Sequence, residues 1–270
     1  MTPLFQESLM SKRDTSVAGT FYPARCSEIN RYIGTFNEAV ENDNTKISAK
    51  ALISPHAGYV YSGFTANAAY RLVDTKKIKR VLVIGPSHRV YLKGASVALY
   101  ESYQSPCGDM KIDVDYSTHL IDTYEVLSFN PTAHSEHSTE TQVPFIKHYF
   151  GEVSLVEIVY GDIDYKELIT LIEKALNDED TFTVISTDLS HFYDLHEANR
   201  LDHLCLKAVE NMSVPELNSG CEACGMIGVK ALLEASKQQG LQTQLIDYRT
   251  SYDASSDASS VVGYMSALIS

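Results

Sequence analysis

Residues 49–58 read AKALISPHAG, a short apolar run that stops abruptly at a histidine. Leu52 and Ile53 supply β-favouring side chains, and a proline and a glycine then interrupt the run. The stretch predicts a buried strand with His56 just beyond its carboxyl end.

The same pattern occurs twice more. Residues 80–88, RVLVIGPSH, end at His88, and residues 181–191, TFTVISTDLSH, contain Asp188 and end at His191. In open α/β sheets, ligands bind outside the carboxyl ends of the strands. We therefore expect the three segments to contribute to one site.

Helical and strand-like patterns alternate along the rest of the chain. Apolar spacing predicts helices over residues 26–41, 139–150, 165–176, 198–212 and 225–239, and strands over 81–84, 95–100, 155–160, 182–186, 242–248 and 260–269. This alternation is typical of an α/β sandwich with a central mixed, largely parallel sheet flanked by helices. We expect a flexible tail over residues 1–13 and a single domain over residues 14–270.

Composition excludes several classes of partner. The 35 acidic residues outnumber the 22 Lys and Arg, giving a net charge of −13, and the basic run at residues 76–80 does not offset it. Nucleic acid and membrane are therefore unexpected partners, and no apolar run approaches the roughly 20 residues of a membrane span. The N-terminal residues lack the apolar core of a secretory signal, and five scattered cysteines favour a reducing compartment over a disulfide framework. We expect a cytoplasmic protein.

His56 and His88 are the first candidates for metal ligands, because neutral imidazole binds first-row metals. One such histidine alone is more often a structural residue, but three at equivalent strand ends favour a site. If the segment after the third strand turns helically, Asp188 and His191 share a face, and the carboxylate orients the imidazole for proton transfer. The alternative is an N-capping aspartate followed by an unrelated histidine.

Cys224 belongs to a lone CxxC with Cys221 and precedes a predicted helix. A helix N-terminus lowers a thiol pKa, so Cys224 is a candidate thiolate nucleophile or metal ligand; the alternative is a buried, inert cysteine. His137, Tyr59 and Tyr61 are candidates to line the same pocket, although either tyrosine could serve packing alone.

Five segments together resemble the Memo family, which in bacteria and archaea is also called AmmeMemoRadiSam system protein B. They are PHAGY at 55–59, GPSH at 85–88, EHS at 136–138, TDLSH at 187–191 and CG at 224–225. The family in turn resembles the class III, LigB-type extradiol dioxygenases, α/β proteins with non-haem iron(II). By this resemblance His56 and His88 match the two histidine ligands, and His191 matches the acid/base histidine. Cys224 stands where those dioxygenases place a ligating glutamate.

The resemblance implies a metal pocket of His56, His88 and Cys224, with iron(II) in first place and copper or zinc as alternatives. A soft thiolate in place of a carboxylate changes metal preference, so ring cleavage does not follow from the fold. The leading hypothesis is a metal-binding protein, and if it is an enzyme we expect a metal-dependent redox reaction on a small organic molecule. The alternatives are a binding or scaffold protein for a peptide or protein partner, including a radical-SAM pathway partner, and a hydrolase using Cys224 with His191.

Overall fold

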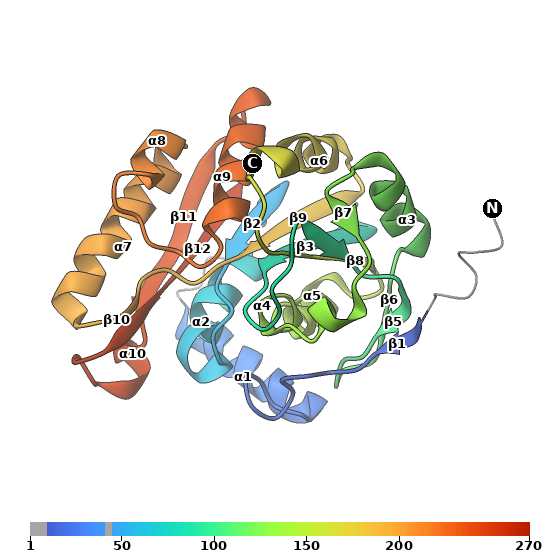
Figure 1. Cartoon of the computed structure of the whole chain (residues 1–270). Helices are drawn as coiled ribbons and strands as arrows, with labels where there is room; N and C mark the ends of the chain where they lie inside the picture. Colours follow the sequence, from blue (N-terminus) through green and yellow to red (C-terminus); the bar gives the residue numbers. More distant parts are fainter. Residues whose placement is uncertain (1–9, 41–44) are drawn as a thin grey trace.

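The computed structural model describes residues 10–40 and 45–270 and shows an α/β fold built on a nine-stranded mixed sheet (Figure 1). Its strands are β2 (Ala51–Ser54), β3 (Arg80–Pro86), β4 (Ala95–Val97), β7 (Leu127–Ser128), β8 (Ser154–Tyr160), β9 (Thr181–Ser186), β10 (His191–Tyr193), β11 (Thr243–Thr250) and β12 (Val261–Ile269). They run in the order β10-β12-β2-β9-β3-β8-β4-β7, and β11 pairs with β12. The centre from β2 to β8 is parallel, whereas β12 and β4 pair antiparallel with it. The expected mixed, largely parallel sheet is confirmed.

Helices cover both faces of the sheet (Figure 1). They are α1 (Cys26–Ala39), α2 (Tyr59–Tyr70), α3 (Val114–Thr123), α4 (His137–Glu140), α5 (Val143–Phe150), α6 (Lys166–Asn177), α7 (Leu195–Glu210), α8 (Val214–Leu217), α9 (Met226–Gln238) and α10 (Tyr252–Ser255), with a 3₁₀ helix η2 (Pro131–His134). Within residues 10–40 and 45–270, no helix combines the length and apolar content needed to cross a bilayer.

Side chains of the central strands alternate between two cores. In β2, Ala51 and Ile53 pack into the core that contains buried residues of α6, α7 and α9. Leu52, between them, packs into the opposite core, with residues of α1, α2 and α5. Successive residues of a strand point to opposite faces, so a run that is apolar throughout is what a sheet covered on both faces requires.

The expected N-terminal tail is shorter than predicted. Residues 10–13 form β1 (Met10–Arg13), which pairs in parallel with β5 (Tyr100–Tyr103) in a small sheet completed by β6 (Met110–Lys111). Arg13 is buried and forms an ion pair with buried Glu140. This buried charge pair, which local sequence does not reveal, fixes residues 10–13 against the body; residues 1–9 lie outside the described part of the chain.

Two element boundaries differ from expectation. The helix predicted over residues 139–150 is divided into α4 and α5, and Pro144 lies in the first turn of α5, where a missing N–H is tolerated. The strand predicted over residues 95–100 ends at Val97, and the chain then enters β5 in the small sheet.

The cysteine prediction was wrong. Cys26 forms a disulfide with Cys107, and Cys205 forms one with Cys221, leaving Cys224 as the free cysteine. The partners are 81 and 16 residues apart in sequence, so only the fold brings them together. The odd cysteine count therefore gives no support to a reducing compartment.

Candidate metal centre

The three strands singled out by their sequence lie side by side as β2-β9-β3 and are parallel. Their register aligns Ser54 with Ser186, at the last position of β2 and of β9. His56, Asp188 and His88 follow just beyond the carboxyl ends of β2, β9 and β3. All three are therefore delivered to one edge of the sheet, as the sequence predicts.

Three histidines converge at this edge. His56, His88 and His137 each offer a ring nitrogen, and these atoms all lie within 4.8 Å of one another. His137 is the first residue of α4, and its ring centroid is 4.5 Å from that of His88 and 5.4 Å from that of His56. The His88 side chain is 30% exposed, whereas that of His56 is only 2% exposed, so the cluster opens to solvent beside His88.

A buried carboxylate, Glu136, holds two of these rings. Its Oε2 accepts the backbone N–H of His88 at 2.7 Å, and its Oε1 lies 3.2 Å from His88 Nδ1 and 3.1 Å from the Ser138 amide nitrogen. Burial alone would raise the pKa of Glu136, but its contacts with His137, His88 and Ser138 hold it well below the usual range. Glu136 is a site residue that the sequence pattern did not predict, although it stands directly before His137.

The contact between His137 and Glu136 is of a different kind. His137 Nδ1 lies 2.8 Å from Glu136 Oε1, an ion-pair contact outside the angular range of an aligned hydrogen bond. The carboxylate is therefore the partner of this nitrogen when the nitrogen carries a proton.

His56 is held from two sides. Its backbone N–H donates to Asp188 Oδ1 at 2.7 Å, and its Nδ1 lies 2.9 Å from Ser186 Oγ. Burial lowers the pKa of His56 to about 4, and the nearby Asp188 charge only partly offsets this. The ring is therefore neutral at ordinary pH, which is the form that binds metal ions.

Cys224 faces the histidines. Its Sγ lies 3.3 Å from His56 Nε2 and 3.2 Å from the Asp188 amide nitrogen. The thiol precedes Gly225, the N-cap of α9, as the sequence predicts. The prediction of a lowered thiol pKa was wrong. Burial, together with the negative charge of Asp188, raises the pKa of Cys224 to about 12 and outweighs the lowering effect of the helix N-terminus. Only a nearby cation would make the thiolate the stable form.

The contacts of the other predicted site residues are with groups outside the three rings. His191 belongs to β10, and residues 187–190 are not helical, so Asp188 and His191 do not share a helix face. Tyr59 is buried and donates its hydroxyl to the carbonyl of Thr141 at 3.0 Å rather than to a histidine. Tyr61 is 45% exposed on α2.

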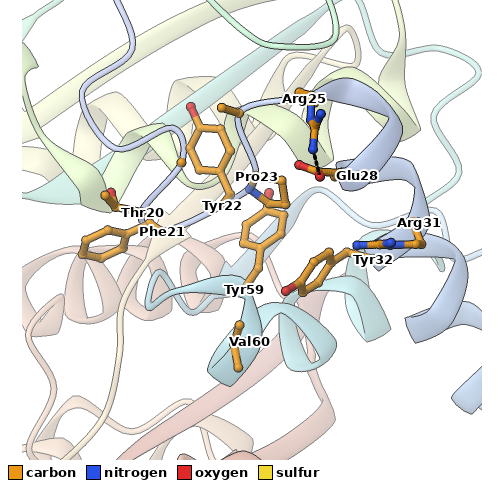
Figure 2. A pocket seen from close by; sticks show the side chains of 12 residues that line it. Thr20, Phe21, Tyr22, Pro23, Arg25, Glu28, Arg31, Tyr32, Tyr59 and Val60 are labelled. Carbon is orange, nitrogen blue, oxygen red and sulfur yellow. Dashed lines mark hydrogen bonds and ion pairs between the residues drawn. The ribbon is translucent and has the colours of Figure 1, made fainter.

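A cavity of about 390 Å³ lies beside the cluster (Figure 2). The rings of Phe21, Tyr22, Tyr32 and Tyr59 line it, and Figure 2 shows Arg25 paired with Glu28 at its edge. The Phe21 ring also contacts the His137 ring, at a centroid distance of 4.7 Å, so one side chain separates the cavity from the cluster. The remaining residues of its wall are Gly19, Thr20, Pro23, Ala24, Arg31 and Val60.

The residues fit a metal ion. Two nitrogens bonded to one ion at roughly 2.0–2.1 Å lie at most about 4.2 Å apart. The three ring nitrogens, all within 4.8 Å of one another, reach that spacing with small side-chain rotations. Imidazole nitrogens with an adjacent thiol are donors suited to a first-row transition metal.

Comparison with known proteins gives one consistent result. A family model described as Memo-like protein matches residues 13–268. A MEMO1 family protein of Aquifex aeolicus is 31% identical over 95% of this chain and 98% of its own length. One from Methanocaldococcus jannaschii is 32% identical over 95% of this chain and 98% of its own length. One from Thermoplasma acidophilum is 29% identical over 94% of this chain and 97% of its own length.

Proposed function

This chain is a member of the Memo family, and on that premise we propose that it binds a transition-metal ion through His56, His88 and His137. The observation that carries the proposal is the convergence of three imidazoles from separate segments, with one nitrogen of each within 4.8 Å of the others. Chance packing of histidines does not explain why a carboxylate, Glu136, is placed to orient two of the three rings.

Cys224 is the fourth donor in this proposal, because its sulfur is already 3.3 Å from His56 Nε2. Three imidazoles with a thiolate favour iron(II), copper or zinc over magnesium or calcium, which take oxygen ligands. We place iron(II) first, in keeping with the resemblance to non-haem iron dioxygenases.

The proposed activity is a metal-dependent redox reaction on a small organic molecule. The bound metal would supply a redox-active Lewis acid, and the exposed side of His88 gives a substrate access to it. Asp188 is the proposed proton acceptor, because its Oδ2 lies 3.9 Å from His56 Nε2 at the base of the cluster. His191, the first residue of β10, is the proposed acid/base histidine by the same resemblance.

Elemental analysis of protein purified anaerobically, without a metal-binding tag, tests the proposal. We expect near-stoichiometric metal in the wild type, less than a tenth of it in His88→Ala, and unchanged metal in His119→Ala, which alters an exposed histidine of α3. Circular dichroism must show the same fold in all three proteins. Absence of metal from the wild type after anaerobic reconstitution with iron(II), copper(I) and zinc(II), or equal metal in His88→Ala, would refute it.

A second candidate is a non-catalytic binding protein that recognises a peptide or protein partner through the cavity of about 390 Å³. Its aromatic wall and the exposed Arg25 and Arg31 support this alternative. Selection from a displayed peptide library with metal-free protein distinguishes the two. Peptides that His88→Ala still binds and Tyr32→Ala does not would favour the binding protein.

A further inference from the structure

We infer that Ser186 is a positioning residue that fixes His56 in the tautomer with its proton on Nδ1, leaving Nε2 free to bind the metal. The inference rests on the proposed metal centre and adds a residue that lies outside the cluster. Ser186 ends β9, is fully buried, and its Oγ has three polar neighbours: His56 Nδ1, Gln142 Nε2 and the carbonyl of Ser138.

The orientation of Gln142 follows from its partners. One terminal atom lies 2.9 Å from the carbonyl oxygen of Pro55, which can only accept, so that atom is the amide nitrogen. The opposite terminal atom, Oε1, accepts the hydroxyl of Tyr70 at 3.0 Å. The second N–H of Gln142 therefore points to Ser186 Oγ, 2.9 Å away, and donates to it.

The proton of Ser186 is then committed as well. Ser186 Oγ lies 2.5 Å from the carbonyl oxygen of Ser138, which again can only accept. A hydroxyl has one proton and two lone pairs, so Ser186 donates to Ser138 and accepts from its two other neighbours. One of these is Gln142, and the other is His56 Nδ1 at 2.9 Å.

His56 Nδ1 must therefore carry a proton. In a neutral imidazole the other nitrogen, Nε2, is then the one with a free lone pair, and it lies 3.3 Å from Cys224 Sγ, on the side of the cluster. The exposed fractions of His56 and Gln142 are 2% and 1%, so bulk water does not replace these partners. Removal of a residue that hydrogen-bonds to a metal-ligating histidine typically lowers metal affinity by about 10- to 100-fold.

The test measures the tautomer directly in metal-free, full-length protein labelled with ¹⁵N-histidine. We expect the His56 ring, assigned by comparison with His56→Asn, to show a protonated Nδ1 and an unprotonated Nε2. In Ser186→Ala the population should shift towards the Nε2–H tautomer, and the affinity for Zn(II), measured by competition with a chromophoric chelator, should fall about 10- to 100-fold.

Thr183→Val is the matched control. Thr183 lies on the same strand and is equally buried, but its hydroxyl has no hydrogen-bond partner, so its loss should leave both the tautomer and the Zn(II) affinity unchanged. Gln142→Met removes the aligning donor and should give a smaller loss of affinity than Ser186→Ala. If Ser186→Ala fails to fold, the wild-type tautomer and Gln142→Met still decide the question.

An Nε2–H tautomer in the wild type, or an unchanged tautomer in a folded Ser186→Ala, would overturn the inference. Failure of the proposed function is a separate result. In that case the wild type shows the Nδ1–H tautomer, Ser186→Ala changes it, and neither protein binds Zn(II). That outcome would support the role of Ser186 in fixing the His56 tautomer and would refute the proposed metal binding.

Discussion

Replacing Glu136 by glutamine should weaken the metal centre without removing any ligand. The carboxylate accepts from His88 N and Ser138 N, and it also lies beside Nδ1 of both His88 and His137. Each group that hydrogen-bonds to the Glu136 carboxylate donates the hydrogen bond to it. Whichever way the new amide is placed, its NH₂ group faces an N–H, so at least one contact becomes repulsive.

The size of the effect follows from the number of rings affected. Loss of one outer partner of a metal ligand typically costs about 10- to 100-fold in metal affinity, or about 1.4 to 2.7 kcal/mol. Because Glu136 serves two rings, we expect Glu136→Gln to lie at the upper end of that range.

Chelator competition with Zn(II) measures the change. Glu152→Gln is the control, since Glu152 is 90% exposed and pairs with Lys147 at the surface. The Zn(II) affinity of this variant should match that of the wild type. An affinity within threefold of the wild type in a folded Glu136→Gln would show that the carboxylate does not orient the rings, and the reasoning would fail.

Three further changes test other parts of the molecule. Glu140→Ala leaves the charge of Arg13 buried and unpaired and should cost about 3–5 kcal/mol in urea denaturation. Burial alone would raise the pKa of Glu140, but the Arg13 charge and neighbouring hydrogen bonds lower it. The carboxylate therefore stabilises the fold above about pH 4.3, and this stabilisation is lost as the pH falls below that value. A Glu140→Gln protein whose stability changes with pH as steeply as that of the wild type in this range would contradict the prediction. Replacing both Cys205 and Cys221 by alanine opens a 16-residue loop and should cost about 3 kcal/mol in urea denaturation, whereas a reducing agent, which also opens the Cys26–Cys107 disulfide, should cost the wild type more. Gly225→Ala places a Cβ 2.6 Å from a backbone oxygen, so it should displace the adjacent thiol and lower Zn(II) affinity; unchanged affinity would separate that thiol from the centre.

The sequence predicts the strand ends well. His56, His88 and Asp188 follow short apolar runs that are buried on both faces, and such runs place their last residues at one edge of a parallel sheet. Local pattern therefore predicts that these strand ends meet, but it offered His191 as the third strand-end histidine, whereas the third ring of the cluster is His137.

The sequence does not predict the residues that hold those histidines. Glu136 was not predicted as a site residue because a carboxylate directly before a helix is readily interpreted as an N-cap. Glu136 also has that role, since it accepts the backbone N–H of Ser138. Ser186 contacts His56 from 130 residues away, and Gln142 contacts Ser186 from 44 residues away, so no local spacing reveals them. The pKa of Cys224 was misjudged because a helix terminus can be read from sequence, whereas burial beside Asp188 cannot.

The position of β2 in the sheet has a consequence for how the protein folds. Among the described residues, its strand partners are β9 and β12, which come from residues 181–186 and 261–269. Neither pairing forms until a very long loop closes, and contacts between residues so distant in sequence slow folding. His56 therefore has no fixed location while the chain emerges from the ribosome, and the metal centre matures only after β12 has inserted beside β2. Metal uptake, followed in time during refolding, should report the completion of the sheet.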